Sequence, residues 1–293
     1  MKITLPLFVV ATAAAAVLLA TGPGCIKTAP RPFHGLDTVT VRDTVYAPKP
    51  DSTVNLTKGL LLYLPFSENI ADSSGNNNPT QAVGSVLTYD AHGYANNAFG
   101  ADGDGVKKVY VTNNGSIQFD TAYSLSLGFM TSDTTLQGAY ISMIDPVTAL
   151  GESFGVGQMT STPSRFTWGT VDYTSGCSQV AINNDINFTD TTNFRPIPGA
   201  WYNAIMTYYK GATHVYINGS LIYSKTGQVS KSNLCPSAQI IIGAWWNNDP
   251  LHFKGKLDNI RLYNRVLTPH EITELAKNYQ VTSNSVKPGV RTN

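Results

Sequence analysis

From Gly59 to about Val266 the chain is a series of short runs, apolar or alternating, that clusters of Gly, Asn and Pro separate. Many short strands with turn residues between them are typical of two packed antiparallel sheets, as in a sandwich or jelly roll. The pattern therefore predicts an all-β domain. The predicted strands are Leu60–Leu64, Lys108–Thr112, Tyr123–Met130, Tyr140–Ile144, Ser153–Gln158, Arg165–Trp168, Trp201–Tyr209, His214–Ile217, Leu221–Tyr223, Gln239–Ile242 and Lys256–Tyr263.

One turn is specified in detail. Asn218 and Gly219 stand between the runs His214–Ile217 and Leu221–Tyr223. Asn-Gly tolerates positive φ at both central positions, which a two-residue type I′ turn requires. The sequence therefore predicts a tight hairpin here.

Only the C-terminal part of the chain has a helical pattern. Thr268, Pro269 and Glu271 have the spacing of a capping box with Pro at the first helical position. Apolar residues then recur with helical spacing, which gives one face to lay on a sheet. These residues are Ile272, Leu275, Ala276 and Tyr279.

The N-terminus has the layout of an export signal. Lys2 precedes the apolar run Ile3–Ala20, and small residues then lead to Cys25. This pattern predicts a cleaved signal peptide over residues 1–24, although a run of 18 apolar residues could also span a bilayer. Cys25 resembles the acylated Cys of bacterial lipoproteins, although Gly22 stands three residues before it where Leu is usual. The alternative is a stray Cys beside an ordinary cleavage site.

These features predict an exported, membrane-anchored lipoprotein at the outer membrane, on its periplasmic face or at the cell surface. Residues 25–56 are Pro-rich and are predicted to form a tether. Within them Thr38–Tyr46 alternates and could stay extended or add to a sheet edge. Residues 281–293 are predicted to be a flexible tail.

The cysteines support the same compartment. The chain has three Cys, so acylation of Cys25 leaves Cys177 and Cys235 as a pair. Disulfides persist outside the cytosol. We expect these two residues to form a disulfide between loops, against the alternative of two unpaired thiols.

Four blocks of sequence, in order, resemble the concanavalin A-like lectin/glucanase superfamily, and within it the laminin-G-like jelly rolls. They are Leu61–Asn78, Asn97–Gly105, Trp201–Gly219 and Ile242–Thr268. The resemblance implies a jelly-roll domain over residues 57–280. The chain departs from the family at Gly128, where a Trp is frequent, and this suggests a bulge or a reshaped sheet face.

The resemblance also implies a structural calcium ion between the opening loop and the final strand. Carried over by position, its ligands would be Glu68, Asp72 and Asp258. The alternatives are that Asp72 caps an Asx-turn and that Asp258 pairs with Arg261 or Arg265.

Catalysis has little support in the sequence. Glycoside hydrolysis needs two carboxylates that flank the bond, but the four Glu residues form no E-x-D-x-E pattern. Asp102 and Asp104 lie between glycines, which predicts a loop, and the five His have no zinc-site spacing. We therefore expect no catalytic residues. The net charge of +1 also gives no indication of a nucleic-acid partner.

Aromatic residues beside amides are the candidate ligand-binding residues, because sugar rings stack on aromatic faces while amides bind hydroxyl groups. One group is Trp245, Trp246, Asn247, Asn248 and Asp249. If the strand before them continued, the two Trp side chains would point to opposite faces. The second candidate is a loop that contains Trp168 and Tyr173.

The sequence thus favours a non-catalytic cell-envelope module for carbohydrate binding or adhesion, with a polysaccharide or glycoconjugate as its partner. The first alternative is a structural domain that binds a surface protein and no sugar. The second alternative is a glycan hydrolase or lyase.

Overall fold

The computed structural model describes residues 54–159, 165–170, 177, 194–226, 231–232 and 234–279, all of which belong to the unit 47–293. The predicted signal peptide, Cys25, nearly all of the tether, and the tail 281–293 lie outside the described residues. So do Thr38–Tyr46 and Tyr173.

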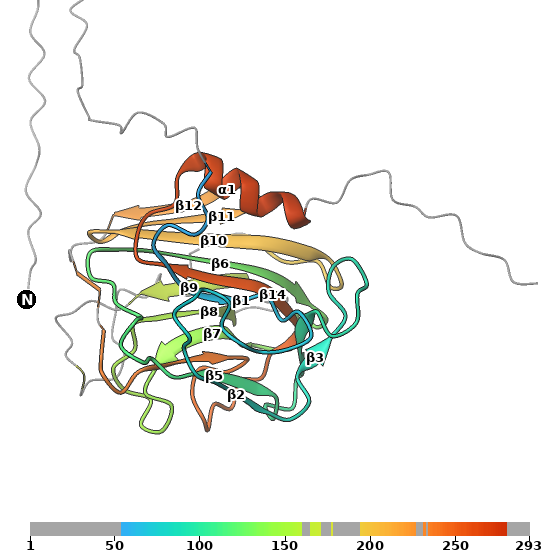
Figure 1. The fold of residues 1–293 in the computed structure, drawn as a ribbon. Coiled ribbons are helices and arrows are strands. Elements are labelled where there is room, and N and C mark those ends of the chain that lie inside the picture. Colours follow the sequence, from blue (N-terminus) through green and yellow to red (C-terminus); the bar gives the residue numbers. More distant parts are fainter. Residues whose placement is uncertain are drawn as a thin grey trace, which may run out of the picture. The chain divides into compact units, whose positions relative to one another are not determined.

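The described residues form two antiparallel sheets that pack face to face (Figure 1). The larger sheet has the order β12-β11-β10-β6-β14-β4-β3, with β1 also paired to β14, and the smaller has the order β2-β5-β13-β7-β8-β9. This confirms the predicted jelly-roll sandwich. The strands are β1 Leu60–Leu64, β2 Thr80–Val83, β3 Leu87–Thr88, β4 Ala98–Asp102, β5 Lys108–Val111, β6 Ala122–Thr131, β7 Gly138–Ile144, β8 Phe154–Met159, β9 Arg165–Thr170, β10 Trp201–Tyr209, β11 Ala212–Ile217, β12 Ser220–Thr226, β13 Gln239–Ile242 and β14 Lys254–Tyr263.

The core lies between the sheets and is rich in aromatic rings. Tyr123 contacts Phe154, Trp168 and Tyr208, and Phe129 lies 5.1 Å from Tyr140 between ring centroids. Each of these rings is almost fully buried. Side chains from every second strand position supply them, as the alternation in the sequence indicates.

Strands β2, β3 and β4 are missing from the predicted set. They are short, and only β4 lies in a block that resembles the family. Asp102, which we expected in a loop, is the last residue of β4. These three strands lie at the edges of the sheets or next to an edge.

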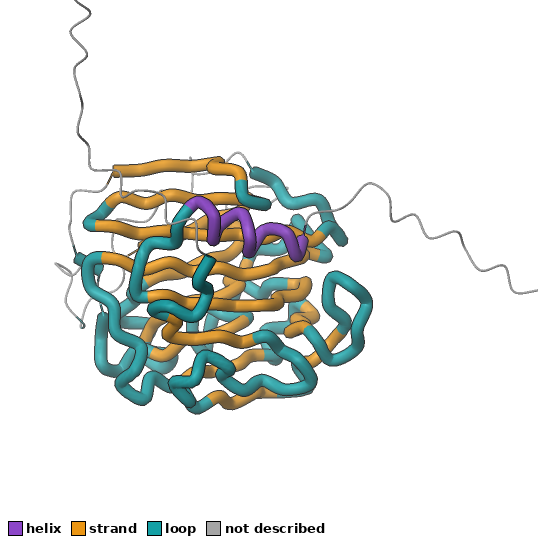
Figure 2. The backbone as a smooth tube through the Cα atoms, turned by 45° about the horizontal axis from the view of Figure 1, so that its top comes forward, coloured by secondary structure: helices purple, strands orange, loops and turns teal. Residues whose placement is uncertain are grey.

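The hairpin and the helix confirm their local signals. Asn218 and Gly219 have φ of 50° and 81° between β11 and β12. Helix α1, Pro269–Ala276, begins at Thr268 with both hydrogen bonds of a capping box, and the 3₁₀ helix η2, Lys277–Tyr279, follows it. Figure 2 shows α1 lying over the strands of the larger sheet, at a shallow angle to them. Its buried face packs on Ile205 and Tyr263.

Arg265 joins both ends of the described domain. Its Nη1 and Nη2 atoms donate to the two carboxylate oxygens of Glu271 at 2.7 Å each. Its Nε and Nη2 atoms also donate to the backbone oxygens of Lys58 at 2.7 Å and Asn55 at 2.9 Å. The guanidinium therefore fastens the start of α1 to the segment that leads into β1.

The reshaped face predicted at Gly128 is present. The register between β14 and β6 shifts between Asp258 and Arg261, so the bulge lies in β14, the partner of the strand that carries Gly128. Over Gly128 lies the phenol ring of Tyr279, which would collide with a Cβ atom at that position. The missing side chain therefore makes room for the end of the C-terminal helix.

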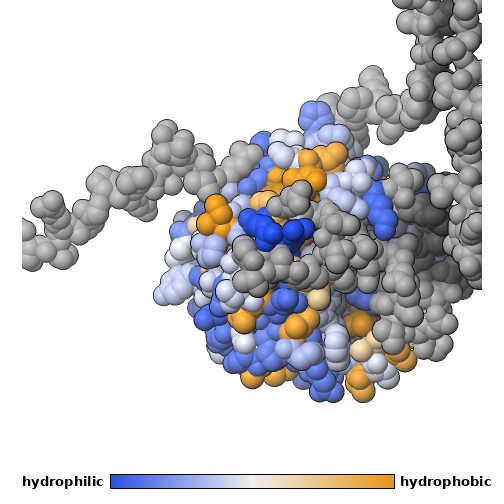
Figure 3. Space-filling view, turned by 180° about the vertical axis from the view of Figure 1, so that it is seen from behind, coloured by the Kyte–Doolittle hydropathy of each residue, from blue (hydrophilic) through white to orange (hydrophobic). Residues whose placement is uncertain are grey.

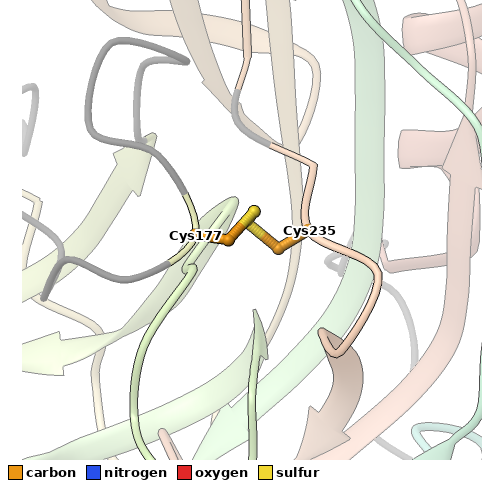
Figure 4. Close-up of a disulfide and its surroundings, with 2 residues drawn as sticks. All are labelled: Cys177 and Cys235. Atoms are coloured by element: carbon orange, nitrogen blue, oxygen red, sulfur yellow. A yellow bond between two sulfur atoms is a disulfide. The ribbon is translucent and has the colours of Figure 1, made fainter.

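The predicted disulfide is also present (Figure 4). Cys177 and Cys235 are joined, with their Cα atoms 5.5 Å apart and a sequence separation of 58. The bond ties Cys177, which follows β9 in the chain, to the segment before β13.

Candidate functional site

The segment after β13 lies on the outer face of the smaller sheet. Gly243, with φ of 89°, ends the strand, so the two following Trp residues do not alternate between faces. Trp245 lies over Gly155 of β8, and Trp246 packs against Ile144 and Ile241. This corrects the expectation of opposite faces: both rings cover the same side of the sheet.

Most of this segment is held by the protein itself. Trp245 is 7% exposed and Asp249 is 5% exposed, while Trp246 and Asn247 are half-buried and Asn248 is exposed. Asp249 accepts hydrogen bonds from the N–H groups of Trp245 and Leu251, both at 2.9 Å. Burial raises the pKa of Asp249, although these donors oppose the shift.

Two residues of β5 hold Asn247 in place. The Nζ atom of Lys108 donates to its backbone oxygen at 2.9 Å, and the Tyr110 hydroxyl donates to its side-chain oxygen at 2.7 Å. Of the five candidates, Trp246 and Asn248 therefore remain accessible to a ligand.

The second aromatic candidate is corrected. We expected Trp168 in a loop, but it lies in β9 and is 1% exposed. Its ring contacts Tyr123 edge to face in the core, so it presents no face for stacking. Strand β9 continues to Thr170, and its alternation carries Trp168 inward.

Asp72 is at the centre of the opening loop. Its two carboxylate oxygens accept hydrogen bonds from the N–H groups of Tyr63, Ser74 and Asn78, at 3.1, 2.9 and 3.0 Å. Burial favours the neutral acid, but these donors outweigh it and hold the pKa of Asp72 below its ordinary value. This is the Asx-turn role named as the alternative to metal binding.

Asp258 lies at the bulge in β14. Its carboxylate accepts from the backbone N–H of Asn259 at 2.7 Å and from the hydroxyl of Tyr279 at 3.0 Å. Burial raises the pKa of Asp258 to about 6, while both hydrogen bonds pull the other way. Neither Arg261 nor Arg265, the partners we considered, forms an ion pair with it among the described residues.

The described residues contain no group of three or more His, Cys, Asp and Glu side chains that could hold a metal ion. Asp72 and Asp258 are already satisfied by N–H and O–H donors, which a cation would have to displace. Calcium held by Glu68, Asp72 and Asp258 stays a prediction, which thermal unfolding with and without calcium would check.

An open cleft of about 460 Å³ lies where the opening loop meets β2 and β3. One carboxylate, two amides and a hydroxyl line it beside apolar side chains. The polar residues are Glu68, Asn69, Ser85 and Asn96, and the apolar ones are Ile70, Ala82, Val86 and Leu87. Of the residues predicted from sequence, only Glu68 lies in this cleft, and we expected it there as a calcium ligand.

The cleft is built on unusual backbone conformations. Glu68 and Asn96 both have φ of 60°, and Phe66 has φ of 53° with its ring fully buried. The N–H of Glu68 donates to the backbone oxygen of Asn96 at 2.8 Å, which joins the two walls. Left-handed conformations at non-Gly residues are costly and cluster at ligand sites.

Sequence reasoning missed this cleft because its walls come from segments far apart in the chain. Residues near 68, 85 and 96 meet only when β2 and β3 take their places in opposite sheets. The one available signal is the polar pair Glu68-Asn69, which begins four positions after the end of the buried strand β1.

The described part of the chain has no helix both long enough and apolar enough to cross a membrane. A search of curated proteins found no match for this chain. A family model described as the concanavalin A-like lectin/glucanases superfamily matches residues 104–273.

Solved structures with the same fold include a domain of an enzyme and the binding domains of toxins. Domain 4 of AbnA, a GH43 extracellular arabinanase from Geobacillus stearothermophilus in complex with arabinotriose, is 19% identical with a TM-score of 0.53. The match covers 74% of this chain and 98% of that domain.

The binding domain of Paraclostridial Mosquitocidal Protein 1 is 18% identical with a TM-score of 0.57, over 77% of this chain and 53% of that domain. The botulinum neurotoxin serotype G binding domain is 19% identical with a TM-score of 0.54, over 75% and 51%. The match thus spans about half of each toxin domain. At these identities the likeness concerns the fold.

Proposed function

Because the chain belongs to the concanavalin A-like lectin/glucanases superfamily, we propose that it is a non-catalytic cell-envelope module that binds carbohydrate. The observation that carries this proposal is the cleft lined by Glu68, Asn69, Ser85 and Asn96. Sugars offer hydroxyl groups on their edges and C–H groups on their faces. A site with a few polar groups beside apolar side chains matches both.

The structural relatives support carbohydrate as the ligand class. The arabinanase domain was solved in complex with arabinotriose. The match covers 98% of that domain and 74% of this chain. The serotype G toxin domain is described as receptor-binding, which supports the alternative of a receptor or protein partner. Figure 3 shows hydrophobic and hydrophilic residues side by side on the described part of one face, a mixed character that carbohydrate sites and non-obligate protein interfaces share.

The composition of the cleft supports a binding role over hydrolysis. Glycoside hydrolases place two carboxyl groups about 5–9 Å apart across the bond. Among the described residues that line the cleft, Glu68 is the single acid. One carboxylate can accept hydrogen bonds from hydroxyl groups, but it cannot act as both acid and nucleophile.

The proposal also includes an anchor. Cys25 would carry the acyl groups, and the Pro-rich residues up to 56 would hold the domain away from the membrane. Mass spectrometry of the mature protein checks this: an unmodified Cys25 in membrane fractions would contradict it.

A glycan array followed by calorimetry with the mature chain tests the function. A hydrogen bond to a charged group contributes about 1.5–3 kcal/mol, so Glu68→Gln should weaken binding about tenfold or more. The matched control is Glu274→Gln, the same change at a partly exposed site on α1, far from the cleft residues in sequence. Binding to a protein partner with no response to any glycan would favour the alternative.

A further inference from the structure

The loop between β3 and β4 exposes two tyrosine rings. Tyr89 is 57% exposed and Tyr94 is 66% exposed, although most tyrosines of the described domain are buried or half-buried. Large aromatic rings lose favourable burial when they face water. Two such rings on one short loop therefore call for an explanation in terms of a ligand or partner.

Hydrogen bonds within the loop, and one from β14, support it. One carboxylate oxygen of Asp90 accepts from the N–H groups of His92 at 2.8 Å and Tyr94 at 2.9 Å. The backbone N–H of Asp90 donates to the backbone oxygen of Tyr94 at 3.1 Å. Lys256 of β14 donates to the backbone oxygen of Tyr89 at 3.0 Å. The rings are thus presented by an ordered support, which lowers the entropic cost of binding.

The same loop is continuous with the wall of the cleft. Leu87, which lines the cleft, precedes Tyr89 by two residues, and Asn96, which also lines it, follows Tyr94 by two. The N–H of Asn97 donates to the backbone oxygen of Thr88 at 2.9 Å, closing the base of the loop. A ligand that leaves the cleft on this side therefore reaches the tyrosines.

We propose that Tyr89 and Tyr94 form an aromatic platform that extends the cleft, so that the ligand is a neutral oligosaccharide of several rings rather than a single sugar. This rests on the proposed function. One ring would occupy the cleft, and the following rings would stack their C–H faces on the tyrosines.

The charges around the site favour a neutral chain. Glu68 forms no ion pair within the described part of the chain, and Asp90 stands at the centre of the loop. A uronic acid would bring another negative charge toward these carboxylates, whereas hydroxyl groups can donate to Glu68. Against these two carboxylates stands the Lys256 ammonium, which donates to the backbone oxygen of Tyr89 and lies 5.9 Å from the centre of its ring.

The experiment compares short and long probes on the mature chain by calorimetry. The probes are arabinose, arabinotriose and arabinohexaose, the glucose, cellotriose and cellohexaose series, and a hexamer of galacturonic acid. Tyr89→Ala and Tyr94→Ala should each weaken binding of the best neutral hexamer by about five- to tenfold, a stacking contribution near 1 kcal/mol. They should leave binding of the corresponding monosaccharide unchanged. Tyr89→Phe, which keeps the ring, should bind as the parent chain does.

The matched control is Tyr209→Ala. Tyr209 is 51% exposed, and it lies near a lysine as Tyr89 does, but at the turn between β10 and β11. Unchanged hexamer binding by the Tyr89 and Tyr94 variants would overturn the platform, as would equal losses for monosaccharide and hexamer or tighter binding of the galacturonic acid hexamer. If the parent chain binds none of the probes and no glycan on an array, the proposed function itself fails.

Discussion

Gly128 and Tyr279 meet at a point where any other residue at position 128 would collide with the tyrosine. A Cβ atom there would overlap the ring carbon that carries the hydroxyl. That hydroxyl donates to Asp258 at 3.0 Å, and the ring stacks on Trp201 with centroids 5.8 Å apart. The end of the C-terminal helix therefore depends on one absent side chain in β6.

Gly128→Ala should lower the free energy of unfolding by about 1–3 kcal/mol, because an extra methyl group forces a packed ring to move. Chemical denaturation measures the loss. In a Tyr279→Ala background the same substitution should cost much less, since the collision is gone. An equal cost in both backgrounds would show that the glycine acts through the backbone rather than through this contact.

Single residues also show why burial was hard to predict. Trp245 is buried because Gly155, on a strand far away in the sequence, leaves space for its indole ring. Nothing next to Trp245 in the chain indicates that space. Pairs such as Cys177 and Cys235 were predictable because only one pairing was open to them once Cys25 was set apart.

At the scale of elements, local signals were reliable where a residue type has a steric requirement. The Asn218-Gly219 turn and the capping box at Thr268 were both predicted and are both present. Strands β2 and β3 were missed because short edge strands carry little hydrophobic pattern. Their absence from the prediction is also why the cleft was not found.

The stability that Glu271 contributes at the start of α1 should fall in acid. Burial favours the neutral form of Glu271, but the hydrogen bonds from Arg265 and Thr268 outweigh it and hold the pKa below its ordinary value. A depressed pKa stabilises the folded state above the unfolded value of about 4.3, and the contribution is lost as the pH falls through the lower folded pKa.

Glu271→Gln should therefore cost about 3 kcal/mol at pH 7, since it leaves the largely buried Arg265 without its anion. The difference from the parent chain should shrink below about pH 4. Denaturation at a series of pH values checks this. Glu274→Gln, which changes an exposed ion pair with Lys277, should cost no more than about 0.5 kcal/mol at any pH. A pH-independent difference for Glu271→Gln would contradict the argument.

At the scale of the whole molecule, the architecture was predictable because four blocks in order resemble one superfamily, and the family model covers residues 104–273. The site was less predictable, since it depends on where loops from both sheets meet. The disulfide is a constraint at this scale, because it closes a loop between residues 58 apart.

Replacing both Cys177 and Cys235 by Ser should lower the free energy of unfolding by about 2–4 kcal/mol, because the unfolded chain regains the freedom that the closed loop removes. Urea denaturation under oxidising conditions measures the loss. In the presence of a reductant the parent chain should match the double variant. A double variant as stable as the oxidised parent would rule out a structural role for the bond.

The four hydrogen bonds of Arg265 described above bring the first and last segments of the domain to one guanidinium. This arrangement suits circular permutation if the linker runs back along α1 and η2, about 15 Å at about 1.5–2 Å per residue, to join residue 279 to residue 54. New termini can then open at an exposed turn such as Gly115. Grafting the module into a loop of a host protein would need the same allowance, because the host would have to span the length of α1 and η2.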